Sequence, residues 1–218
     1  MPKPTGFNVV VAATNLNPSI FSLLWLVKQK IFSAADIQTE GSVFSPFAVN
    51  VVAPGLSLTV IPDRLQLGFL SAEKDAQVAL KIQRVVGRIV SELPHTPFQA
   101  VGFNMGWVLL PQDQKELDSL ERQSFLAERN PLAKFFKEKN SHFGCYLSKD
   151  FKMGRLQPDI KPVTLVEGEK SLQAAFKFHL DLKIDEPVKQ IHEFLALWNP
   201  AYTLAKEMVT ELGKGWSK

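Results

Sequence analysis

The sequence predicts an α+β fold built on a large, mainly antiparallel, twisted sheet, with the helices packed chiefly on one face. Residues 7–93 and residues 98–212 show the same order of expected elements: a strand, a helix, three strands and a helix. Several of the strands alternate apolar and polar side chains with period two. No linker separates the two similar halves, about 1–94 and 95–218, so we expect a single compact domain over residues 1–218 with an internal pseudo-repeat.

The first half opens with a strand and a hydrophobic helix. Residues 7–13 are apolar apart from Asn8 and include three successive valines, which predicts a strand buried on both faces. Asn17 and Pro18 are typical of a helix start, so a helix is expected from Pro18 to Phe32. Its apolar residues form no single stripe, which predicts cover on more than one side, by the core or by a partner. The candidate interface residues are Phe21, Leu24 and Trp25.

A meander and a second helix complete the first half. Residues 41–70 read as three strands, joined by proline-containing turns at 53–55 and 61–64. A helix then follows from Ser71, a suitable N-cap, and ends before Pro94. Its apolar residues step by three and four positions and give one stripe. The stripe consists of Ala79, Ile82, Val86, Ile89 and Leu93.

The strand expected over residues 98–110 has two very different faces. Its odd positions from Val101 to Leu109 are all bulky, whereas its even positions from Ala100 to Gly106 are all small. Glycine on one side of a strand indicates that another backbone, a helix or a ligand comes close there. The favoured interpretation is a helix packed on the sheet, and the alternative is a ligand groove. The candidate ligand-binding residues are Gly102, Asn104, Gly106 and, from a later strand, His179.

The second half continues with helix and then three strands. Residues 114–139 favour two helical pieces, and strands are expected over 143–151, 160–166 and 172–184. A hairpin turn at 167–170 joins the last two strands. On the last strand the apolar residues face one way and the polar residues face the other, which is typical of a strand with one wet side.

Two amphipathic helices are expected at the C-terminal end. The first begins near residues 185–187, and the second starts at Asn199 and Pro200, where the asparagine caps the helix. Gly213 then ends the second helix. The apolar stripes of both pieces are expected to lie on the sheet.

The composition argues against nucleic-acid-binding, disulfide-bonded and membrane proteins. The 25 basic and 22 acidic residues are interspersed and give a net charge of +3, which supports nucleic-acid binding only weakly. Cys145 is the single cysteine, so an intrachain disulfide is excluded and the reducing cytoplasm is the expected location. No stretch has the pattern of a signal peptide or of a membrane-spanning helix, so no membrane association is expected.

The histidines form no reaction centre that local sequence encodes. His142 and Cys145 point to opposite faces of a strand and cannot chelate one ion. Asp181 is placed to orient His179, but no nucleophile is near in sequence, and a solvated surface row explains the pair. His192 lacks the second histidine of a zinc-protease helix. No phosphate-binding loop or nucleophile elbow is present, so no catalytic residue, metal or cofactor is expected.

These observations favour a non-enzymatic cytoplasmic binding or assembly module, a subunit of a homo-oligomer or of a larger protein complex with a protein partner. The alternative is a small-ligand-binding protein or a hydrolase-like enzyme that uses the small-residue strand face around Asn104. A nucleic-acid-associated subunit is the third alternative.

Overall fold

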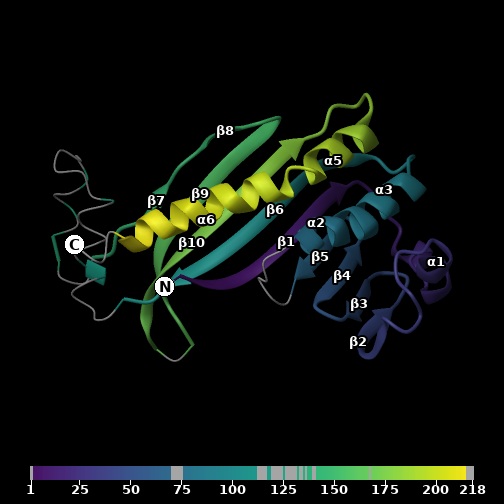
Figure 1. Cartoon of the computed structure of the whole chain (residues 1–218), viewed down its shortest axis with the longest axis horizontal. Coiled ribbons are helices and arrows are strands. Elements are labelled where there is room, and N and C mark those ends of the chain that lie inside the picture. Colours follow the sequence, from purple (N-terminus) through teal and green to yellow (C-terminus); the bar gives the residue numbers. More distant parts are fainter. Residues whose placement is uncertain are drawn as a thin grey trace.

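A computed structural model describes residues 2–69, 76–111, 141–166 and 168–214, with a few isolated positions between 112 and 140 (Figure 1). The helices expected over residues 114–139 therefore lie outside the described residues, apart from those isolated positions. The N-cap expected at Ser71 also lies outside them.

The strands of the described part form a single ten-stranded sheet. Their bounds are β1 Lys3–Ala13, β2 Gln38–Phe44, β3 Val49–Ala53, β4 Leu56–Ile61, β5 Arg64–Phe69, β6 Phe98–Leu109, β7 Cys145–Tyr146, β8 Lys149–Phe151, β9 Gly154–Thr164 and β10 Lys170–Asp181. The order is β2-β3-β4-β5-β1-β6-β10-β9-β7, and β8 pairs with β9. Each pair is antiparallel. The predicted mixed α+β class and the large antiparallel sheet are confirmed.

The helices form a layer over the sheet. Their bounds are η1 Pro18–Ile20, α1 Leu23–Lys28, α2 Ala76–Ile82, the π turn η2 Gln83–Gly87, α3 Arg88–Glu92, α5 Pro187–Leu195 and α6 Trp198–Lys214. In Figure 1, α2, α3, α5 and α6 lie across the same face of the sheet. Both α5 and α6 contact β6, and α6 also contacts β10.

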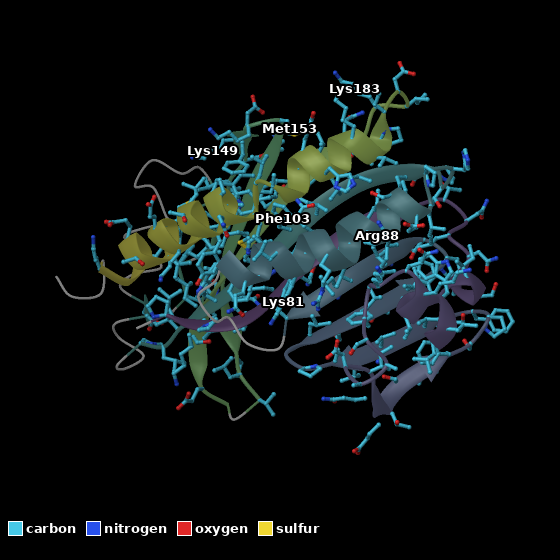
Figure 2. The ribbon with its side chains drawn as sticks, turned by 45° about the vertical axis from the view of Figure 1, so that its right-hand side comes forward. Lys81, Arg88, Phe103, Lys149, Met153 and Lys183 are labelled. Carbon is cyan, nitrogen blue, oxygen red and sulfur yellow. The ribbon has the colours of Figure 1, made fainter. Side chains whose placement is uncertain are left out.

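The hydrophobic core lies between this helical layer and the sheet. The odd positions of β6 are buried, as their bulk predicts, and Phe103 has no exposed surface. The Phe103 ring centroid lies 4.7 Å from that of Phe194 in α5 and 5.1 Å from that of Trp198 in α6. Figure 2 shows Phe103 beneath the helices. The predicted apolar stripe of α5, which includes Ile191 and Leu195, is buried.

Strand β1 is buried on one face only, which corrects the expectation of two buried faces. Phe7, Val9 and Val11 are buried, whereas Asn8 and Val10 are only half-buried. The physical reason is that β1 lies near the centre of a sheet whose second face carries no helix in the described part. Valine favours a strand even on a half-exposed face, so the apolar run overstated the burial.

The expected helix from Pro18 to Phe32 is wrong in its extent, because it is divided into η1 and the shorter α1. The Asn17 side chain accepts a hydrogen bond from Ser19 N at 3.0 Å and caps η1. Ser22 Oγ accepts a hydrogen bond from Trp25 N at 3.2 Å and begins α1. A second cap inside the apolar run therefore starts a new helix instead of continuing the first.

The first-half meander has four strands rather than three. Residues 43–51, expected as one strand, are divided into β2 and β3 by a tight turn in which Ser45 N donates to Ala48 O at 3.1 Å. Pro46 lies in this turn and has no N–H to donate to a strand ladder. The turns expected at 53–55 and 61–64 are confirmed.

The strands of the second half differ from the prediction in their boundaries. The strand expected over 143–151 is divided into β7 and β8, which both pair with β9. The strand expected over 160–166 begins earlier, at Gly154. The last strand ends at Asp181, and Ile184 beyond it is 97% exposed instead of facing the core.

Two helical regions also depart from the predicted pattern. The helix over residues 76–92 contains the π turn η2, whose extra residue brings Val85 and Val90 into the buried stripe. Helix α6 already includes Asn199 and continues through Gly213, so Asn199 is not its cap and Gly213 does not end it.

Candidate functional site

The face of the sheet opposite the helices is a polar surface, which we call the open face. Across it, in register from β5 to β9, lie Gly68, Asn8, Asn104, Lys177 and Gln157. In Figure 1 no helix of the described part lies over these central strands on this side. The favoured interpretation, a helix packed on the small-residue face of β6, is therefore wrong for the described residues.

The close neighbours of the β6 glycines are the adjacent strands. A Cβ atom at Gly102 would lie 2.9 Å from the carbonyl oxygen of Phe178 in β10. A Cβ atom at Gly106 would lie 2.6 Å from Thr5 Oγ1 in β1. The small residues therefore permit these close approaches, and they also keep the surface low at the centre of the open face.

A concavity of about 530 Å³ lies on the open face. Its lining includes Gly6, Gly106 and Ala175, which lie in register across β1, β6 and β10 and form a floor of small residues. Most of the other lining residues carry hydrogen-bonding side chains: Thr5, Asn8, Asn104, Tyr146, Gln157, Asp159 and Lys177. The volume lies within the range of about 300–1,000 Å³ that is common for small-molecule sites.

Two asparagines from the central strands meet at this concavity. Asn104 Nδ2 donates a hydrogen bond to Asn8 Oδ1 at 2.8 Å, across the pairing of β1 with β6. The bond fixes both amide groups. Among the described residues, Asn104 Oδ1 and Asn8 Nδ2 have no further partner, so both acceptor and donor groups remain for a ligand.

Asp159 and Lys177, the charged side chains of the described lining, differ in whether an ion pair already occupies them. Lys161 Nζ contacts Asp159 Oδ2 at 2.7 Å and balances the charge of that carboxylate. The exposed Lys177 makes no ion pair with any residue of the described part. Tyr146 is 64% exposed and presents its ring and hydroxyl at the rim. Among the described residues, the concavity therefore offers one cation without an ion pair, Lys177, beside neutral polar groups.

Gly102 and His179 lie beside the concavity and not in its lining. They face each other across the β6–β10 pairing, one row from Asn104. His179 Nε2 lies 3.0 Å from Asp181 Oδ1, so the contact expected from the sequence is present. The residue opposite His179 on β9 is Arg155, whose Nη1 donates to Asp150 Oδ1 at 2.9 Å. An arginine held in an ion pair does not act as a nucleophile, so this neighbour supplies none to His179.

The described residues give no metal centre and no activated thiol. Within the described ranges, no group of three or more His, Cys, Asp or Glu residues is arranged to hold a metal ion. Burial raises the pKa of the Cys145 thiol, and the negative charge of Asp159 raises it further. Because the thiolate is the nucleophile, Cys145 is protonated and poorly reactive at neutral pH.

The three candidate interface residues differ in exposure. Phe21 has no exposed surface and belongs to the core, so it is not available to a partner, and this corrects the expectation. Its ring centroid lies 5.1 Å from that of Trp25, which is half-buried. Leu24 is 77% exposed. Of the three, only Leu24 presents a large apolar surface, because Phe21, at the end of η1, packs in the core and Trp25 packs against it.

Several lining residues were missed from the sequence, Asn8 above all. A signal for Asn8 does exist, since the tripeptide Gly-Phe-Asn occurs at residues 6–8 and again at 102–104. The two phenylalanines also occupy matching places: Phe7 pairs with Phe69 and Phe103 pairs with Phe178. Residues from β7 and β9 carry no such signal, because their place beside β6 depends on pairings distant in sequence.

Comparison with known proteins adds no family to this geometry. No model of a protein family matches the chain, and no curated protein matches it. In the described part of the chain, no helix is both long enough and apolar enough to span a membrane.

Proposed function

We propose that this protein is a non-enzymatic binding module of the cytoplasm that takes a small polar ligand in the concavity of the open face. The observation that carries the proposal is the hollow of about 530 Å³, which has a floor of small residues and a rim of hydrogen-bonding side chains. Concave sites with a few convergent polar groups are the usual places where proteins hold small molecules.

The side chains of the rim favour binding over catalysis. Asn8, Asn104 and Gln157 are amides, which donate and accept hydrogen bonds but do not exchange protons near neutral pH. General acid–base catalysis needs a group that titrates near the working pH and reaches the reacting atom. The His179–Asp181 pair, which the sequence suggested for such a role, lies outside the lining.

The same side chains define the class of ligand. Lys177 has no ion pair among the described residues and favours an anionic group on the ligand. Asn104 Oδ1 and Asn8 Nδ2, which have no further partner in the described part, favour a ligand with both donors and acceptors. The exposed Tyr146 ring offers a flat apolar contact at one side. A small carboxylate with hydroxyl or amide groups meets the polar requirements, and a flat apolar part of such a ligand would contact the Tyr146 ring.

A thermal-shift screen of small polar carboxylates tests the proposal. We expect at least one compound to raise the melting temperature of the wild-type protein and to lose this effect in Asn104→Leu and Lys177→Gln. Gln66→Leu is the matched control, because Gln66 is half-buried on the same face but does not line the concavity. A compound that stabilises Asn104→Leu as well as the wild type binds elsewhere, and that result would remove the proposed site.

We also propose that the two halves are related by internal duplication, with the Asn8–Asn104 pair at the symmetry axis. Support comes from the shared Gly-Phe-Asn tripeptide and from the flanking strands, since β5 pairs with β1 as β10 pairs with β6. An experimental structure tests this proposal. Superposition of the two halves is expected to align Asn8 with Asn104 by a rotation of about half a turn, and any other alignment contradicts it.

Self-association is a second candidate function, favoured by one observation. Large exposed apolar side chains gather on α1 and on β2 with its turn, which lie at the same end of the sheet in Figure 1. They are Leu23, Leu24, Val43, Phe44 and Phe47. Contiguous exposed apolar surface marks many protein interfaces, and β2 is also an edge strand.

Size-exclusion chromatography with light scattering tests this second candidate. We expect the wild type to form a dimer or a larger species at high concentration, and Leu24→Asp with Phe47→Ser to be monomeric. Ile184→Ser is the control, because Ile184 is even more exposed but lies beyond the end of β10. A wild-type protein that stays monomeric at every concentration rules out self-association.

A further inference from the structure

A second hollow of about 470 Å³ lies on the helical side of the molecule, between the segment after α1, the η2–α3 helix and α5. We call it the helix-side pocket. Three basic side chains line it: Lys30 after α1, Arg84 in η2 and Arg88 in α3. Figure 2 shows Arg88 in the helical layer. This pocket shares no residue with the concavity of the open face, so it is independent of the proposed function.

The helix-side pocket carries a positive charge that its neighbours only partly balance. No carboxylate is among its lining residues. Arg88 Nη2 contacts Glu92 Oε1 at 2.9 Å, so one of its faces is occupied. Hydrogen bonds from Ser33 lower the pKa of the nearby Asp36 carboxyl, and the positive charge of Arg84 lowers it further. Lys30 makes no ion pair within the described part of the chain.

Ser91, His192 and Gln83 also line the pocket and are held in fixed positions. Ser91 Oγ lies 2.9 Å from His192 Nε2, which joins α3 to α5. His192 can come this close because residue 87 is glycine: a Cβ atom there would lie 3.1 Å from His192 Cε1. The same Cβ atom would lie 3.0 Å from Gln83 Oε1. A glycine in the π turn therefore lets two lining side chains lie against the helix.

Two backbone features occur where the basic side chains are presented. Arg84 and Gly87 belong to the π turn η2, and single π turns inside helices are frequent at functional sites. Lys30 has a φ of 56°, a left-handed conformation that is uncommon for a residue with a side chain. Lys30 N also donates to Val27 O at 3.0 Å, so this turn is fixed by α1.

We propose that the helix-side pocket binds the phosphate group of a small phosphorylated molecule. Arginine side chains match the geometry of phosphate oxygens, and lysine adds a point charge. The Ser91 hydroxyl and the Gln83 amide supply uncharged hydrogen-bond donors beside these cations. The volume of about 470 Å³ exceeds the needs of a single phosphate ion and accommodates a small organic phosphate.

Isothermal titration calorimetry with inorganic pyrophosphate at low ionic strength tests the proposal. We expect saturable binding with one site per chain, and a dissociation constant raised about tenfold or more in Arg84→Gln and in Lys30→Gln. Lys28→Gln is the matched control, because Lys28 is an exposed lysine two positions away that does not line the pocket. Arg84 and Lys30 are both exposed, so neither substitution is expected to prevent folding.

The remaining outcomes overturn the proposal. Absence of heat at millimolar pyrophosphate would show that the pocket is not a phosphate site. Equal weakening in Lys28→Gln and Arg84→Gln would show that only the overall positive charge attracts the anion. The same titration with a random-sequence DNA duplex distinguishes the source of the phosphate. Tighter binding of the duplex than of pyrophosphate, lost in Arg84→Gln, would replace the small molecule by nucleic acid.

Discussion

At the scale of the residue, Gly102 and Gly106 of β6 differ in what an added methyl group would meet. The Cβ of Gly102→Ala meets the backbone carbonyl of Phe178, which cannot turn away, whereas the Cβ of Gly106→Ala meets the hydroxyl of Thr5, which can rotate. We expect Gly102→Ala to lower the free energy of unfolding by about 1–3 kcal/mol, and Gly106→Ala to lower it by less. Urea denaturation of the two variants measures this difference, and equal losses contradict the explanation.

The lone cysteine gives a second prediction at the same scale. Because burial and Asp159 raise the pKa of the Cys145 thiol, we expect alkylation by iodoacetamide at neutral pH to be slower than for free cysteine. The rate is expected to rise as the thiolate forms, at a higher pH than for the reference thiol. Mass spectrometry of timed samples measures the rate, with N-acetylcysteine as the reference. A rate at pH 7 equal to the reference would show an ordinary pKa.

The raised pKa of Cys145 also fixes the sign of its effect on stability. Folding favours the protonated thiol, so this contribution to stability is fully present below the pKa of the unfolded thiol. It is lost as the pH rises through the higher pKa of the folded state. Cys145→Ser is therefore expected to lose less stability than the wild type on going from neutral to alkaline pH.

At the scale of the element, the cap at Ser22 determines how the hydrophobic segment after β1 folds. Ser22→Ala removes the acceptor for Trp25 N, and we expect it to lower the free energy of unfolding by about 0.5–2 kcal/mol. Ser19→Ala is the control, because Ser19 donates its hydroxyl to Asn17 but caps no helix. Chemical denaturation compares the two. If Ser19→Ala is the more damaging, the start of α1 does not depend on Ser22.

The elements predicted well from sequence are those whose pattern is local. β4, β5 and the β9–β10 hairpin combine period-two alternation with turn residues, and both signals act within a few residues. The segment from Pro18 to Phe32 was predicted poorly because apolar content alone does not show which cap starts the helix. The π turn η2 was missed because its sequence gives no distinct signal. Val85 and Val86 are two adjacent apolar residues, and adjacent apolar residues also occur in regular helices.

The candidate site was only partly predictable for the same reason. Asn104 and Gly106 could be named because one strand carries the whole alternation of bulky and small residues. Tyr146, Gln157 and Lys177 reach the concavity only because β10 pairs with β6 and β9 pairs with β10. The register between strands that are distant in sequence cannot be predicted from either strand alone. The repeated Gly-Phe-Asn tripeptide was the one available signal for Asn8.

At the scale of the whole molecule, one sheet separates two different surfaces. The helical side holds the core and the basic helix-side pocket, while the open face carries the polar concavity. The first half contributes Lys30, Arg84 and Arg88 to the helix-side pocket, and the second half contributes His192. Both hollows therefore combine residues from the two halves, so either site depends on the halves staying together.

The contact between the halves, which we call the joint, is the pairing of β1 with β6 together with the side chains packed on it. We expect this joint to make the protein unfold as a single unit. β1 pairs with β6 along most of its length, and across this joint the ring centroids of Phe7 and Trp107 lie 5.0 Å apart. Phe69 of the first half likewise lies 5.7 Å from Trp198 of the second. Separation of the halves would expose these rings to water on both sides. We expect no stable intermediate with only one half folded.

Hydrogen exchange with mass spectrometry, carried out over a series of urea concentrations, tests this expectation on the full chain. Peptides from β4 and β5 report on the first half, and peptides from β9 and β10 report on the second. Cooperative unfolding predicts the same midpoint and the same slope for both sets, because neither half can lose its core alone. Val9→Ala removes buried side-chain volume from β1, next to the joint, and is expected to lower both midpoints together. If Val9→Ala lowers only the first set, or if the wild-type midpoints differ, the halves are separate folding units and the chain is two domains.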